Sequence, residues 1–183
     1  TAIGTGALAN NTTAGNNTAV GRSALLANTT GAENVAIGKS ALSANTTANN
    51  NTAVGVNALL VNTTGLDANT TGTNSTAVGF NALSANTTAV NNVAIGSQSM
   101  ASATTGGYNT AVGNNTLQAH TTGNYNVAIG EQALYAKTTA SNNTAVGASA
   151  LLANTTGASN TAVGHNAADA ITTSSYNVAI GGN

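Results

Sequence analysis

The stretch Asn34-Val35-Ala36-Ile37-Gly38 decides the fold, because its pattern returns along the chain at a fixed interval. An Ala-(Val/Ile)-Gly step occurs eleven times, and its glycines lie 17 residues apart except for one interval of 24. These repeat glycines are Gly4, Gly21, Gly38, Gly55, Gly79, Gly96, Gly113, Gly130, Gly147, Gly164 and Gly181. A fixed short period is the signature of a repeat architecture. We therefore predict one repeat domain over 1–183, with a seven-residue loop insertion near 66–72.

Each repeated segment is short, alternating and rich in β-branched residues, which indicates a strand. No helical spacing of apolar residues is present. An antiparallel meander would need hairpin turns, yet their strongest signal, Asn-Gly, is absent from a chain with 21 Gly. Identical segments at one spacing instead favour parallel stacking with like residues over like. The expected fold is an all-β parallel β-solenoid, or β-roll, of about 10–11 coils of 17 residues.

The composition argues against a compact, enzyme-like domain. Ala, Thr, Asn and Gly make up two thirds of the chain, only 4% of residues are charged, and the net charge is −1. The absence of cysteine excludes a disulfide framework and a thiolate metal site. No basic patch points to nucleic acid, and neither a secretory leader nor an apolar run long enough for a membrane span is visible. We expect no cofactor.

The repeats can be compared with one another as a substitution record. The residue two before each repeat glycine is always Ala, the residue just before it is Val or Ile, and Asn stands four before it with Ser75 as one replacement. By contrast, the first residue after the glycine ranges from Arg22 and Lys39 to Phe80 and Glu131. We expect the variable positions to be solvated and the uniform ones to be buried or stacked.

The invariant alanine predicts a seam between chains. Neighbouring residues of a strand point to opposite faces, so either the Ala row or the Val/Ile row points outward, and neither varies as a solvated row should. Both faces are therefore expected to be covered. Small Ala side chains would let a second chain approach closely. The candidate self-association row is Ala19, Ala36, Ala53, Ala77, Ala94, Ala111, Ala128, Ala145 and Ala162.

The segment Asn-Val-Ala-Ile-Gly, found at 34–38, 92–96, 126–130 and 177–181, resembles the repeat core of trimeric autotransporter adhesin heads. The fuller unit Asn-Thr-Ala-Val-Gly-x-x-Ala-Leu-x-x-Asn-Thr-Thr-Gly is also similar to repeats of bacterial and phage tail-fibre-like proteins. The resemblance extends over essentially the whole chain as short motifs, although the 17-residue period is longer than that of the adhesin heads. It implies a left-handed roll, association into trimers, and an extracellular or cell-surface fibre that serves adhesion or spacing.

The few titratable residues predict no active site. Most of the charged side chains fall in separate coils or loops; they are Glu33, Asp67, Glu131, Asp169, Arg22, Lys39 and Lys137. His120 and His165 are more than two coils apart, which is too far for a shared metal ion. Both histidines are expected to be solvated substitutions at variable positions. We expect neither catalysis nor metal binding.

Three surface functions remain. The first is a structural subunit of a fibre or filament, that is, a self-associating stalk or adhesin rod. Its expected partners are copies of itself and surface glycans. Because the chain begins and stops inside a strand motif, we expect its ends to continue in a longer protein or to be covered. The alternative is an ice-binding β-solenoid with an outward Thr row. One row is fewer than a wide flat face needs, because adjacent Thr residues of a pair point opposite ways.

The third surface function is glycan attachment. Asn-x-Ser/Thr acceptor sequences recur in equivalent turns of the repeats, so one row of turns could carry sugars in a secreted protein. The candidate glycosylation residues are Asn28, Asn45, Asn62, Asn86 and Asn154.

Overall fold

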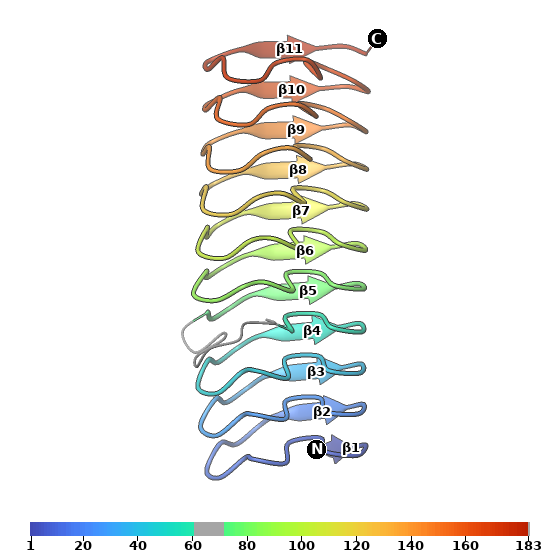
Figure 1. The fold of residues 1–183 in the computed structure, drawn as a ribbon, viewed down its shortest axis with the longest axis vertical. Helices are drawn as coiled ribbons and strands as arrows, with labels where there is room; N and C mark the ends of the chain where they lie inside the picture. Colours follow the sequence, from blue (N-terminus) through green and yellow to red (C-terminus); the bar gives the residue numbers. More distant parts are fainter. Residues whose placement is uncertain (61–71, 183) are drawn as a thin grey trace.

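The computed structural model describes residues 1–60 and 72–182 as a straight stack of coils (Figure 1). Each coil contributes one short strand, and the described residues form no helix. The strands are β1 (Ala2–Ile3), β2 (Thr18–Val20), β3 (Val35–Ile37), β4 (Thr52–Val54), β5 (Thr76–Val78), β6 (Val93–Ile95), β7 (Thr110–Val112), β8 (Val127–Ile129), β9 (Thr144–Val146), β10 (Thr161–Val163) and β11 (Val178–Ile180).

All eleven strands form one parallel sheet in sequence order. Equivalent residues lie over one another, as Ala19 over Ala36 in β2 and β3. The register continues across the 24-residue interval, because Thr52 of β4 pairs with Thr76 of β5. The predicted parallel β-solenoid with 17-residue coils is therefore confirmed. The insertion predicted near 66–72 lies outside the described residues except for Gly72.

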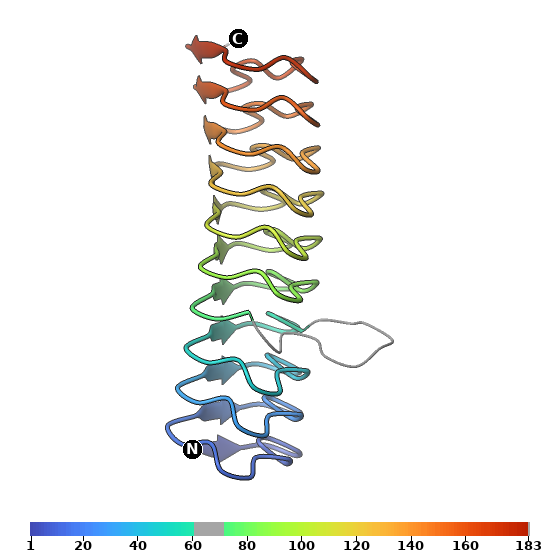
Figure 2. The same ribbon diagram turned by 90° about the vertical axis from the view of Figure 1, so that its left-hand side faces the viewer.

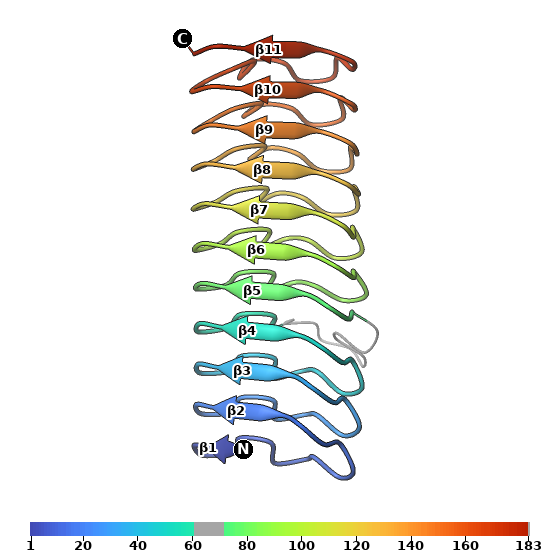
Figure 3. The ribbon, with the colours of Figure 1, turned by 180° about the vertical axis from the view of Figure 1, so that it is seen from behind.

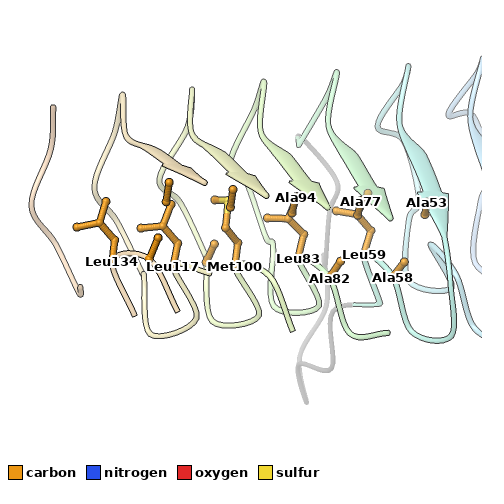
Figure 4. Packing of buried hydrophobic residues seen from close by; sticks show 14 of the residues in the cluster. Ala53, Ala58, Leu59, Ala77, Ala82, Leu83, Ala94, Met100, Leu117 and Leu134 are labelled. Atoms are coloured by element: carbon orange, nitrogen blue, oxygen red, sulfur yellow. The ribbon is translucent and has the colours of Figure 1, made fainter. Parts of the chain in front are cut away.

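Side chains along each strand alternate between the inside and the outside of the coil, and the small residue points inside. The middle Ala of every strand from β2 to β10 is fully buried, whereas the Val or Ile before the repeat glycine lies outside. Of the two assignments that the sequence leaves open, the one with Ala inside is correct. A column of larger residues packs opposite this Ala column, as Leu83, Met100, Leu117 and Leu134 show in Figure 4. Figure 2 shows the strands stacked along one side of the rod, and the residues buried on the inner side of these strands are alanines.

The repeat glycine is required where the strand turns the corner of the coil. Its φ lies between 124° and 141° in all copies, a region that residues with a Cβ rarely adopt. The next coil is also in the way, since a Cβ on Gly96 would stand 2.3 Å from the carbonyl oxygen of Gly113. The fixed glycine period therefore follows from both backbone conformation and coil-to-coil contact.

Buried asparagines join successive coils between the strand and the turns. Asn126 accepts a hydrogen bond on Oδ1 from the backbone N–H of Asn143 at 2.9 Å, and its Nδ2 donates to the Ala140 carbonyl at 3.2 Å. The same amide also donates to Asn109 Oδ1 at 2.8 Å. Because buried polar groups must be paired, each coil is satisfied only when its neighbours are present. The stack is thus held by polar columns as well as by the Ala and Leu columns.

Candidate functional site: the outer face of the sheet

Figure 3 shows the eleven strands stacked as one sheet. The outward side of this sheet carries two parallel rows of side chains. The Val/Ile row holds the residues just before the repeat glycines: Ile3, Val20, Ile37, Val54, Val78, Ile95, Val112, Ile129, Val146, Val163 and Ile180. The Thr/Val row holds the residues two positions earlier: Thr18, Val35, Thr52, Thr76, Val93, Thr110, Val127, Thr144, Thr161 and Val178. We call these two rows together the outer face.

The Val/Ile row is apolar along the whole stack, and its residues are exposed or half-buried. In the middle coils, Ile37, Ile95 and Ile129 are 40–41% exposed, and Val163 is 38% exposed. Single exposed apolar residues are normal, but a contiguous apolar patch on a protein surface marks an interaction site. With rungs about 4.8 Å apart and three residues per strand, the strands alone present roughly 500 Å², which is near the upper end for monomers.

The Thr/Val row adds hydroxyl groups to this apolar face. The six threonines of the row are half-buried, and their side-chain oxygens have no hydrogen-bond partner within the described chain. Each hydroxyl can therefore bond water or a group of another molecule. Neither row of the outer face contains a charged residue.

The Thr-Thr pairs lie in the turns and behave differently. The first Thr is mostly half-buried, and its hydroxyl donates to the backbone of the next coil, as Thr121 Oγ1 does to the Thr138 carbonyl at 2.8 Å. The second Thr, for example Thr105 or Thr122, is exposed. A single regular Thr row therefore faces out from these turns, as the sequence predicts.

The predicted self-association row is wrong in its residues. The alanines from Ala19 to Ala162 are fully buried inside their own chain, so no second chain can touch them. The reason is the width of the coil, which accepts only a methyl group on the inner side of the strand. The invariant surface that remains for a partner is the outer face.

The predicted glycan row is also inside the coil. Four of its members, Asn28, Asn45, Asn86 and Asn154, are fully buried, and Asn62 lies outside the described residues. The Asn154 amide donates to the Gly157 carbonyl at 2.9 Å, and its Oδ1 accepts from the Gly157 N–H at 3.0 Å. A side chain that closes its own turn in this way has no room for a sugar. In the folded rod these four positions are structural.

Two titratable residues occupy this same buried asparagine column, which the sequence analysis missed. His120 and Lys137 stand in successive coils, 17 residues apart, and both are fully buried, so the prediction that His120 is solvated is wrong. His120 Nε2 lies 2.8 Å from the Gly123 carbonyl and replaces the asparagine amide there. The aligned position of Asn154 in the next coil is the signal that would have placed both residues inside.

Burial changes the proton affinity of both groups. Loss of water lowers the pKa of Lys137 to about 7 from 10.5. The pKa of His120 falls to about 4, first through burial and then through the charge of Lys137 nearby, while the Gly123 carbonyl opposes the change. Among the described residues, Lys137 Nζ and His120 Nδ1 have no hydrogen-bond partner. His165, by contrast, is exposed as predicted.

Outside the outer face, the first residue after each repeat glycine forms a variable corner row. Its charged members in the described chain, Arg22, Lys39 and Glu131, are exposed as predicted. A second surface feature, not foreseen from the sequence, is the stacked pair Tyr108 and Tyr125, with ring centroids 5.0 Å apart and planes at 16°. Stacked rings in adjacent coils help to hold the coils together.

The described residues hold no group of three or more His, Cys, Asp or Glu side chains that could bind a metal ion. No helix in the described part of the chain is long and apolar enough to cross a membrane. Comparison with protein-family models, curated proteins and solved structures finds no match to this chain. The likeness to adhesin heads and tail fibres therefore rests on short sequence motifs.

Proposed function

We propose that this chain is a structural subunit of an extracellular or cell-surface fibre, in which rods associate side by side through the outer face of the sheet. The observation that carries the proposal is the combination of exposure and invariance in the Val/Ile row. The corner row, only two residues away, has diverged to Arg22, Phe80 and Glu131, so the repeats have had time to change. A row that is exposed or half-buried and stays apolar over eleven copies is best explained by a partner that covers it.

A second copy of the same chain fits this face better than an unrelated surface. Two identical rods share the same rung spacing of about 4.8 Å, so their side-chain rows stay matched along the full contact. The strands present roughly 500 Å² and the rows beside them widen the contact toward the ~800 Å² per partner of a stable interface. The absence of charge on the outer face also removes the cost of burying ions.

The experiment replaces two neighbouring residues of the outer face by lysine. Because Ile95 and Val112 point outward, the variant I95K/V112K should fold, yet it would have to bury two charges to associate. The control T105K/T122K places the same charges on the exposed Thr row. Sedimentation and negative-stain electron microscopy should show assemblies for the unaltered chain and the control, and single rods for I95K/V112K. Single rods for the unaltered chain at all concentrations would overturn the proposal.

Ice binding is a second candidate, favoured by the threonines of the outer face. Their free hydroxyls recur at intervals of one or two rungs among the methyl groups, so the outer face offers two side-chain rows where the Thr-Thr turns offer one. The test is thermal hysteresis of freshly diluted protein. Ice binding by the outer face predicts that T110K abolishes hysteresis and T105K does not; binding by the exposed Thr row predicts the reverse. No hysteresis in the unaltered chain would remove this candidate.

The proposal assigns the chain no enzymatic reaction. Its described acids, Glu33, Glu131 and Asp169, stand in different coils, and the two buried bases are closed off from solvent. Location outside the cell, a role in adhesion and binding of surface glycans rest on the motif resemblance. Antibody labelling of intact source cells would test the location.

A further inference from the structure

The two rows of the outer face differ in chemistry, which restricts how a second copy can lie on it. Two identical copies that meet through the same face are related by a two-fold axis. If this axis runs along the rods, the partner's strands are reversed and its Val/Ile row covers the Thr/Val row. If the axis runs along the strand direction, the rods are antiparallel and each row meets its own kind. Only the second arrangement lets Thr hydroxyls meet hydroxyls, and methyl groups meet methyl groups, when water is removed.

The strand sequences match well in two overlaps of such a pair. With β7 on the two-fold axis, the strands from β3 to β11 match without exception, but no opposite charges of the corner row meet. With the axis between β5 and β6, the overlap is one strand longer. When β3 lies opposite the partner's β8, both strands read Val-Ala-Ile. In the same overlap β2 meets β9 and β4 meets β7, and all four read Thr-Ala-Val. Ten of the eleven strands then overlap over about 43 Å, with mismatches where β5 meets β6 and where β1 meets β10.

The charges of the corner row fit the same overlap. Lys39 follows β3 and Glu131 follows β8, and both side chains are exposed beside the outer face. In the antiparallel pair Lys39 would stand next to the partner's Glu131, and the two-fold axis creates the same contact twice. Arg22, which follows β2, would meet an uncharged alanine after the partner's β9, so no like charges are brought together. Exposed ion pairs add little affinity, but they do fix orientation.

We propose that two copies of this chain pair through their outer faces with antiparallel rod axes, β3 of each opposite β8 of the other, with two Lys39–Glu131 contacts setting the orientation. This inference rests on the proposed function, because it assumes that the outer face binds a second copy. It adds the direction and the register, which the proposed function leaves open.

The first test is a charge-swap cycle measured by sedimentation at low salt. K39E and E131K should each weaken pairing about fivefold, since each contact occurs twice, and K39E/E131K should restore it. R22E is the matched control and should change pairing less than twofold. If E33K, and not E131K, restores K39E, the rods are parallel, because that arrangement places Lys39 beside the partner's Glu33.

The second test measures the direction directly. The chain has no cysteine, so R22C and S97C each give one site for a spin label. In the antiparallel pair the two labels at position 22 are seven rungs apart, about 34 Å along the rod, whereas those at position 97 are one rung apart, about 5 Å. A parallel pair would give one common distance at both positions, because the two labels would then lie in the same rung at opposite ends of the strands. That result, or intact pairing without charge coupling, overturns the inference and leaves the proposed function standing; absence of pairing removes both.

Discussion

The repeat glycine meets two separate demands, a positive φ and a missing Cβ, and the last coil separates them. Gly96 and Gly181 have nearly the same φ, 132° and 124°, but a Cβ on Gly181 would have no atom within 4 Å. We expect G96A to cost at least about 3 kcal/mol, from strain plus collision with the next coil, and G181A about 1 kcal/mol from strain alone. Urea denaturation followed by circular dichroism would measure both. Equal losses would show that φ alone keeps the glycine.

Lys137 makes stability depend on pH in a predictable direction. Its pKa is about 7 in the fold and 10.5 as the ordinary value, so between these limits the unfolded chain binds a proton that the folded chain lacks. Stability should therefore rise with pH from about 7 upward, by at most about 1.4 kcal/mol per pH unit, while the full penalty is present below pH 7.

The variant K137N returns the column to asparagine and should remove this slope while raising stability at neutral pH. The matched control is K39N, which removes an exposed lysine and should leave the slope intact. The midpoints of denaturant unfolding at pH 7, 8 and 9, measured for both variants and the unaltered chain, would show whether the slope is lost. A slope that persists in K137N would mean that the buried amine is not its source.

At the scale of the coil, the polar column has one weak link. Ser75 replaces the asparagine four before the repeat glycine, and its Oγ accepts from the Asn92 N–H at 3.4 Å, against 2.9 Å for the Asn126–Asn143 bond. We expect S75N to stabilise the rod by about 1 kcal/mol, because the longer side chain reaches Asn92 and can donate to the Ala89 carbonyl. Thermal melting would test this. Destabilisation would show that the space at Ser75 is already filled.

The strands and their register could be predicted because glycine, alanine and asparagine recur at one spacing. Which side of the strand faces inward could not, because alternation fixes only that neighbours differ. The usual ranking of hydrophobic residues favours Val inside and Ala outside. The narrow coil reverses that order, since the opposite wall is filled by residues such as Leu117 and leaves room for a methyl group only.

The errors in the candidate sites arise because polar residues of the repeat are expected at the surface, whereas the structure buries them. The sequence predicts Asn28 and Asn154 in surface turns because Asn-Thr-Thr is polar, yet these amides close the turn from inside. It predicts His120 to be solvated because it is a polar substitution in a repeat, and it makes no prediction about the burial of Lys137. Their alignment with those asparagines was visible, but it acquires meaning only when the asparagine column is known to be buried.

For the whole molecule, stability should be a sum over coils and their interfaces. Removing residues 35–51 deletes one coil of 17 and joins Asn34 to Thr52, which recreates the Asn-Thr-Ala-Val-Gly strand. We expect this shortened chain to fold, with an unchanged circular dichroism spectrum per residue and a slightly lower denaturation midpoint. Removing 35–50 instead leaves one extra residue between Asn34 and Thr52, which must bulge out of the coil ahead of the strand and should lower the denaturation midpoint further. Equal midpoints for the two shortened chains would contradict the stacked register.

The coil-to-coil bonding of the sheet has a mechanical consequence. In a rod pulled by its two ends, the tension peels the terminal coil away from its neighbour, so the bonds of one rung break in turn while the others stay unloaded. Each 17-residue coil that comes free lengthens the tether by about 50 Å. Such a rod would yield in small, equal steps at modest force and would wind up again when slack, as an extensible spacer does, whereas two rods paired along their length would share the load and resist stretching.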